Sequence, residues 1–187
     1  MNAHPTIAGG NTSQFCIGPA MSSPLYACSG GQIVLPHLVL CDRQDGGHLI
    51  VNPPRPVWER SLLTPQELTQ WSFLIAATGR AMLETLPVLQ GGCLNYWEAG
   101  NWALNDQATP MGPKDPSQHR RVHLHVFGRS PSSQDRDWRW GESPKFPDFA
   151  DASKWACRFS PLTAGECQAI TDRVAVLLAT VYAAAAP

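Results

Sequence analysis

Residues 121–129 combine two histidines and an arginine at the spacing of a β-strand. Because alternate side chains of a strand point to opposite faces, one face is apolar and comprises Val122, Leu124 and Val126. The opposite face comprises Arg121, His123, His125 and Phe127. Charged histidines beside an arginine repel one another, so an anion would stabilise this face. The pattern therefore predicts a site for phosphate or another oxyanion, with histidines available for nucleophilic or proton-transfer chemistry.

The same two histidines also allow less reactive interpretations. They could be polar residues on the solvent side of a strand, and His-x-His is also a spacing found among metal ligands. A third ligand of such a metal-dependent enzyme would have to come from His37, His48, His119 or Glu98. The positive charge of Arg121 disfavours a cation, so we expect no bound metal. We expect His48 to be a structural residue of the sheet.

The composition restricts the classes of function. The chain has 187 residues, is 43% hydrophobic and carries a formal net charge of −1, so it lacks the basic footprint of a nucleic-acid-binding protein. The six cysteines are scattered without zinc-knuckle spacing, which favours free thiols in a reducing compartment. We find no pattern typical of a secretory signal, and the apolar residues 169–186 include Asp172 and Arg173. We therefore expect a cytoplasmic protein without a membrane span or a nucleic-acid partner.

Strand and helix patterns follow one another in an order that favours the α+β class. The expected strands are residues 33–35, 38–40, 48–52, 94–98, 102–105 and 121–129. Asp45-Gly46-Gly47 predicts a turn that joins the early runs into a hairpin. Capping boxes that begin at Thr64 and Thr163 predict a long helix to about Leu86 and a C-terminal helix. Because most connections between strands are too short for parallel crossovers, the sheet should be antiparallel with helices on one face.

The chain divides into three stretches. Residues 1–25, which are rich in Gly, Ser, Pro and Asn, are expected to form an irregular N-terminal arm. Residues 26–130 contain the strands and the long helix of the central domain. Residues 131–187 are expected to form a C-terminal extension, an aromatic-rich coil and a helix, that packs on the same domain.

Residues 121–129 resemble the histidine triad motif, in which three histidines alternate with apolar residues before a short run that ends in arginine. Residues 47–53 are similar to that family's strand that ends in proline and basic residues, and residues 64–68 resemble the start of its helix. Asn105 is similar to the asparagine that precedes the family's active-site loop. These matches occur in the expected order over residues 33–129. The chain is therefore identified as a member of the histidine triad (HIT-like) superfamily.

The resemblance implies a fold and a reaction. The HIT-like fold is a five-stranded antiparallel sheet with a long helix. The reaction is hydrolysis, favoured over nucleotidyl transfer, at the α-phosphate of a dinucleoside polyphosphate or an AMP conjugate through a phosphohistidine intermediate. No cofactor is required, with Mg²⁺ on the substrate phosphates as an option. The implied partners are a small-molecule nucleotide and a second copy of the chain in a homodimer.

The resemblance also implies site residues. His123 matches the nucleophile, and His125 matches the histidine that contacts the phosphate or assists the leaving group. Asn105 would hold a phosphate oxygen or position the loop. Phosphate contacts are further expected from Ser117 and Gln118, which lie just before the motif but not in the family's usual order.

Two positions depart from the family pattern. Arg121 replaces the first triad histidine, and Pro56 stands where a histidine often follows the proline-basic segment. We expect Arg121 to compensate in part through its permanent charge and forked donors, as a phosphate-binding residue. The same departures motivate an alternative function, a non-catalytic nucleotide-binding or regulatory module that keeps the pocket without turnover.

Overall fold

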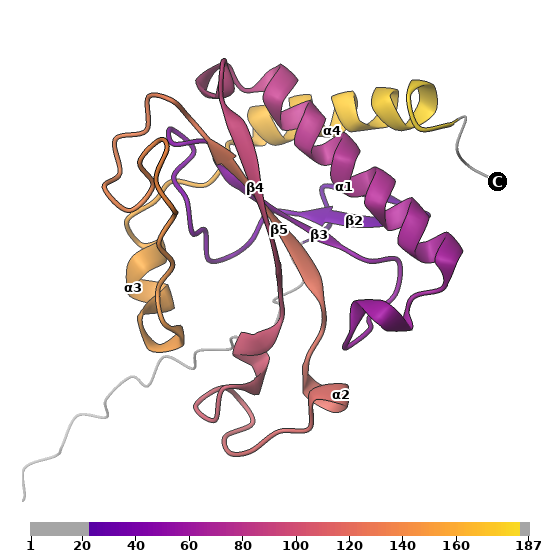
Figure 1. The fold of residues 1–187 in the computed structure, drawn as a ribbon, viewed down its shortest axis with the longest axis vertical. Coiled ribbons are helices and arrows are strands. Elements are labelled where there is room, and N and C mark those ends of the chain that lie inside the picture. The colour runs from indigo at the N-terminus through magenta and orange to yellow at the C-terminus, as the bar shows by residue number, and fades with distance from the viewer. Residues whose placement is uncertain (1–22, 184–187) are drawn as a thin grey trace, which may run out of the picture.

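The computed structural model describes residues 23–183 and shows an α+β protein built on a five-stranded antiparallel sheet (Figure 1). The strand order is β1-β2-β3-β5-β4. The strands are β1 Tyr26–Cys28, β2 Gly31–Val34, β3 His48–Asn52, β4 Cys93–Ala99 and β5 His123–Arg129. The α-helices are α1 Pro65–Thr85, α2 Pro116–His119, α3 Ala152–Ala156 and α4 Ala164–Thr180. The predicted α+β class is confirmed, while most of the expected N-terminal arm lies outside the described residues.

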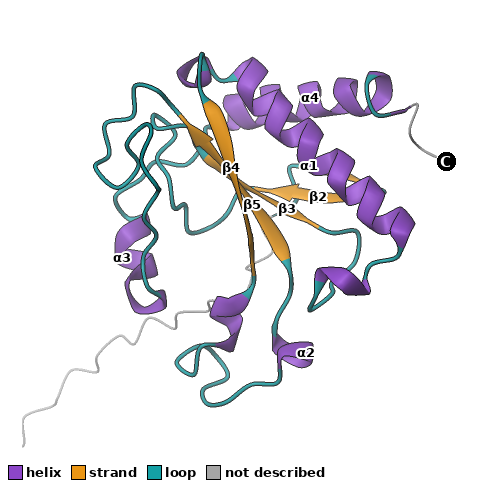
Figure 2. Cartoon of the chain, in the orientation of Figure 1, coloured by secondary structure: helices purple, strands orange, loops and turns teal. Residues whose placement is uncertain are grey.

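Short 3₁₀ helices occur in the connections between these elements (Figure 2). They are η1 Arg60–Leu62, η2 Pro87–Leu89, η3 Asn101–Leu104 and η4 Phe149–Asp151. No helix between residues 23 and 183 has both the length and the apolarity that a bilayer-spanning helix requires. The cysteines within the same residues are free thiols.

The long helix α1 is specified locally and covers one face of the sheet. Thr64 and Glu67 form the predicted capping box, and Pro65 occupies the first turn. The buried side of α1, which includes Trp71, packs against strand residues of one face: Ile33, Leu49, Val51, Leu124 and Val126. Burial of each such side chain contributes about 1.5–3 kcal/mol. This helix-covered face therefore holds the main apolar core.

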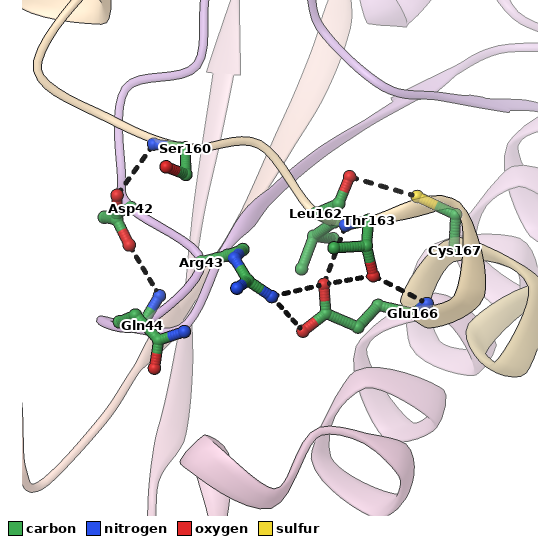
Figure 3. A network of polar contacts seen from close by, with 8 residues as sticks. All are labelled: Asp42, Arg43, Gln44, Ser160, Leu162, Thr163, Glu166 and Cys167. Atoms are coloured by element: carbon green, nitrogen blue, oxygen red, sulfur yellow. Dashed lines mark hydrogen bonds and ion pairs between the residues drawn. The ribbon is translucent and has the colours of Figure 1, made fainter.

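The C-terminal helix α4 packs against α1 on the same side of the sheet (Figure 1). Its predicted capping box forms between Thr163 and Glu166. The Glu166 carboxylate also accepts hydrogen bonds from Arg43 Nη1 at 3.2 and 3.4 Å (Figure 3). Beside it, Asp42 Oδ2 accepts from the Ser160 N–H at 2.7 Å. These contacts attach the C-terminal extension to the connection between β2 and β3.

The aromatic-rich coil of the extension lies on the opposite side of the sheet, together with α3 (Figure 2). The Trp138 ring contacts Phe127 of β5 with ring centroids 5.4 Å apart. Arg129 is buried and donates to the carbonyls of Arg139 and Glu142 at 2.6 and 2.8 Å. Its guanidinium also lies 4.8 Å from the centroid of the Trp138 ring. Individual contacts of this kind, rather than a periodic pattern, hold the coil on the sheet.

Three details of the expected strands were wrong. Residues 38–40 form no strand, because Leu40 packs under Trp138 and its N–H donates to a histidine ring instead of a neighbouring strand. Residues 102–105 form η3 and its end, because Gly100 turns the chain at φ +135° and its carbonyl then accepts from Ala103. Strand β5 begins two residues later than expected.

Candidate functional site

The pairing of β3 with β5 places a third histidine, His48, next to the two histidines of β5. His123 and His125 point to the face of β5 opposite α1, as does Phe127. In the strand register, Trp97 of β4 lies opposite His125, and His48 of β3 lies opposite Phe127. Because directly opposed residues share a face, all five side chains lie on one side of the sheet.

His48, His125 and His123 form a continuous hydrogen-bonded series, here called the histidine chain. Nε2 of His48 lies 2.8 Å from Nδ1 of His125, and Nε2 of His125 lies 3.0 Å from Nε2 of His123. Both ends of the histidine chain form hydrogen bonds with backbone groups. The Leu40 N–H donates to His48 Nδ1 at 3.2 Å, and His123 Nδ1 lies 2.9 Å from the Arg121 carbonyl oxygen.

The two backbone contacts determine where the protons of the histidine chain lie. His48 Nδ1 accepts from Leu40, so a neutral His48 carries its proton on Nε2 and donates to His125. His125 then carries its proton on Nε2 and donates to Nε2 of His123. His123 in turn donates from Nδ1 to the Arg121 carbonyl. Every hydrogen bond is satisfied with all three rings neutral, and the lone pair of His123 Nε2 accepts the bond from His125.

Burial favours the same neutral state. Burial, with a smaller repulsion from His123, lowers the pKa of His48 to about 3. Burial also lowers the pKa of His125 well below its ordinary value, with further contributions from the other two imidazoles. The pKa of His123 is lowered chiefly by burial and to a lesser extent by the charge of Arg120, although its bond to the Arg121 carbonyl opposes the shift. The histidine chain is therefore uncharged near neutral pH.

Exposure to solvent differs along the histidine chain. His48 is 1% exposed and His125 is 8% exposed, whereas His123 is only half-buried. A ligand from solvent can therefore reach His123 first. There it meets a neutral imidazole whose orientation is fixed through Nδ1, which is the arrangement of an activated nitrogen nucleophile. The His125 Nε2–H, which now contacts His123, is the nearest donor for an oxygen of the ligand.

The two arginines before β5 have different surroundings. The exposed Arg121 donates from Nη1 to the carbonyls of Ser117 and Arg120 at 3.2 and 2.6 Å, so this nitrogen contacts the preceding loop. Arg120 forms an ion pair with Glu59 at 3.0 Å and donates to Asn101 Oδ1 at 3.1 Å. Of these two guanidinium groups, only that of Arg120 adds to the effect of burial in lowering the pKa of His123. The cation that acts electrostatically on His123 is therefore Arg120 and not the expected Arg121.

The remaining predicted phosphate ligands lie in the loop that joins β4 to β5. Asn105 Oδ1 accepts from the Gln107 N–H at 2.9 Å, which closes a turn within that loop. Ser117 Oγ contacts Asp115 Oδ1 at 2.8 Å at the start of α2, and Gln118 is exposed in the same short helix. Within residues 23–183, none of these three side chains forms a hydrogen bond with the histidine chain.

Sequence reasoning missed His48 as a member of the site. Its type and its place in a strand were visible, but the pairing of β3 with β5 was not. The three histidines form a line rather than a convergent set, and no group of His, Cys, Asp and Glu in the described part of the chain is arranged to hold a metal ion. Two open hollows of about 370 and 320 Å³ lie on the helix-covered side and contain none of these histidines.

Comparison of the sequence with models of protein families and with curated proteins found no match. The function proposed below therefore depends on the geometry of the histidine chain.

Proposed function

We propose that this chain is a HIT-like nucleotide phosphohydrolase that acts at an α-phosphate through a phosphohistidine on His123, with nucleotidyl transfer as the related reaction. The observation that carries the proposal is the fixed, neutral state of His123. Its Nδ1–H is held by the Arg121 carbonyl at 2.9 Å, so Nε2 of this half-buried ring carries no proton, and its lone pair becomes available when the His125 N–H turns away. The five-stranded antiparallel sheet, the long helix α1 and the order of the motifs support membership of the superfamily.

The reaction follows from the proton positions. The lone pair of His123 Nε2 attacks phosphorus, an N–P bond forms, and the bond to the leaving group breaks with its electron pair. His125 Nε2–H turns from His123 to the phosphoryl oxygen or the leaving atom and stabilises the developing charge. Because the neutral histidine chain has no proton to spare, water supplies the proton that the leaving group takes. The hydroxide that this transfer leaves then attacks phosphorus, breaks the N–P bond, releases the nucleotide and restores neutral His123.

His48 acts in this proposal as a positioning residue. It donates to His125 Nδ1 at 2.8 Å and is itself oriented by the Leu40 N–H. This contact keeps the proton of His125 on the nitrogen that faces His123. Mg²⁺, if the substrate carries it, would enter with the phosphates.

The surroundings of Arg121 and Asn105 favour the alternative, a nucleotide-binding or regulatory module without turnover. Arg121 Nη1 bonds to carbonyls of its own loop, and Asn105 Oδ1 closes a turn. In this alternative the phosphate binds near His123, but too few donors stabilise the charge that develops during attack.

The test is incubation of the protein with diadenosine polyphosphates and AMP phosphoramidates, with His123→Ala as the matched variant. Release of AMP by the wild type alone, with an acid-labile AMP adduct on His123 after rapid quenching, supports the hydrolase. If both proteins bind AMP and both are inert, the binding module replaces it. If neither protein binds or cleaves any of these nucleotides, both proposals fail.

A further inference from the structure

The peptide group between Arg121 and Val122 orients the His123 ring and is itself anchored from one side. Its N–H donates to the Val57 carbonyl at 2.9 Å. Because the N–H and C=O of a trans peptide point in opposite directions, the Arg121 carbonyl points away from Val57. There it accepts from His123 Nδ1 at 2.9 Å. A small displacement of this one peptide group would therefore move the hydrogen bond that fixes the ring.

Gly100 lies against this carbonyl. The pair of Ala99 with His123 is the last of the ladder between β4 and β5, and the chain turns at the next residue, Gly100, with φ +135°. A Cβ atom at position 100 would lie 2.7 Å from the Arg121 carbonyl oxygen and 3.3 Å from its carbonyl carbon. Real Cβ atoms essentially never approach another heavy atom within 3.0 Å, and the atom met here belongs to the backbone. Any side chain at this position must therefore displace the carbonyl or open the turn.

The turn is held in place by the residue that follows Gly100. Asn101 Oδ1 accepts from Arg120 Nε at 3.1 Å, and Arg120 also forms the ion pair with Glu59 at 3.0 Å. These contacts hold the end of β4 against the residues that precede β5. Because the turn is fixed from its next residue, a side chain at position 100 would be accommodated by displacement of the Arg121 carbonyl.

We propose that Gly100 is a positioning residue for the nucleophile, because the absence of a side chain at this turn lets the Arg121 carbonyl occupy the position from which it holds His123 Nδ1. Gly100 makes no contact with the substrate in this proposal and acts only through the carbonyl. The inference deepens the proposed function and rests on it for the effect on the rate. The hydrogen bond itself can be measured without turnover.

The test compares Gly100→Ala with Gly112→Ala. Gly112 lies in the loop between β4 and β5 and also has a positive φ of +100°, but beyond its chain neighbours a Cβ atom there would meet no atom of residues 23–183 within 4 Å. Both variants therefore introduce backbone strain, and only Gly100→Ala introduces the contact with the carbonyl. NMR of protein with ¹⁵N-labelled histidine rings detects the His123 Nδ1–H, which exchanges slowly with solvent while it is hydrogen-bonded.

We expect a protected His123 Nδ1–H signal in the wild type and in Gly112→Ala, and its loss in Gly100→Ala. Hydrolysis of an AMP phosphoramidate by Gly100→Ala should be slower by at least about tenfold in kcat per folded molecule, because the nucleophile is no longer oriented. Gly112→Ala should keep the wild-type rate. If Gly100→Ala does not fold, the comparison is made in the Arg120→Ala background, where the new methyl group still meets the carbonyl but no longer meets Arg120 Cγ, which otherwise lies 3.2 Å away.

A protected signal in Gly100→Ala, or its equal loss in Gly112→Ala, overturns the positioning role. Loss of the signal in Gly100→Ala without any change in kcat would remove the positioning role and leave the hydrolase. Loss of the signal in Gly100→Ala alone, together with a wild type that cleaves no nucleotide, would remove the hydrolase and leave Gly100 as the residue that positions the carbonyl.

Discussion

The two faces of the sheet are formed by the same strands but are held by different interactions. On the helix-covered face, Leu124 and Val126 pack beneath α1 with other apolar side chains. On the opposite face, the alternate residues His123 and His125 of the same strand are held by directed hydrogen bonds that begin and end on the backbone. Apolar packing tolerates rearrangement, whereas the histidine chain fixes one proton on each ring. The helix-covered face therefore contributes mainly stability, and the proposed chemistry belongs to the opposite face.

The largest expected effect is on the histidine face, where His123→Gln should lower kcat by at least about a thousandfold, because the variant lacks the nucleophilic nitrogen. The half-buried position should limit the loss in the free energy of unfolding to about 1 kcal/mol. Steady-state hydrolysis of an AMP phosphoramidate and urea denaturation measure the two quantities. A variant that keeps a tenth of the wild-type rate would show that His123 is not the nucleophile.

The next change lies one residue away on the helix-covered face. Leu124→Ala removes a side chain that is 5% exposed and should lower the free energy of unfolding by about 2–5 kcal/mol. Because Leu124 points away from the histidine chain, kcat per folded molecule should stay within about threefold of the wild type. The same two assays apply, at a temperature where the variant is fully folded. A large loss of kcat with unchanged stability would contradict the division between the faces.

The histidine face should also make stability depend on pH. Unfolded histidines bind protons near pH 6.5, whereas the pKa of folded His48 is about 3 and those of the other two are also lowered. The unfolded state therefore binds more protons below pH 6.5, and stability falls with acidification by up to about 1.4 kcal/mol per pH unit for each histidine.

His48→Gln is the informative variant for this effect. The Gln oxygen can accept from the Leu40 N–H and its nitrogen can donate to His125, so both contacts are retained without a group that titrates in this range. Urea denaturation from about pH 7 to about pH 4 should show a shallower slope for the variant, by up to about 1.4 kcal/mol per pH unit. Carboxylates titrate in both proteins and cancel in the difference. Identical slopes would mean that His48 is not buried as a neutral ring.

The sequence was informative where structure is determined locally. Both long helices begin at capping boxes that the sequence contains, and the alternation in residues 122–126 gave the two faces of β5 correctly. The sequence could not show that residues 38–40 leave the sheet, because the alternative partner of the Leu40 N–H is the ring of His48. Contacts between distant segments decided that outcome.

For the candidate site too, local spacing could be predicted from the sequence, whereas contacts between strands could not. The common face of His123 and His125 follows from their spacing, but the contribution of His48 depends on which strands are neighbours. The proton positions depend on the backbone groups of Leu40 and Arg121, which side-chain patterns do not describe. The expected compensation by Arg121 assumed that β5 already included this residue, but the strand begins at His123.

The smallest expected effect concerns the two arginines before β5, and the prediction tests which of their charges acts on His123. Arg121→Ala should change kcat/KM by less than about threefold, because its guanidinium bonds to loop carbonyls in an exposed position. Arg120→Ala is the matched comparison, since the positive charge of Arg120 lowers the pKa of His123. Its removal should raise that pKa and move the acid limb of the kcat/KM profile to higher pH, because a larger fraction of His123 is then protonated and unable to attack. If Arg121→Ala moves the acid limb and Arg120→Ala does not, the residue in the first triad position is the one that acts on the nucleophile.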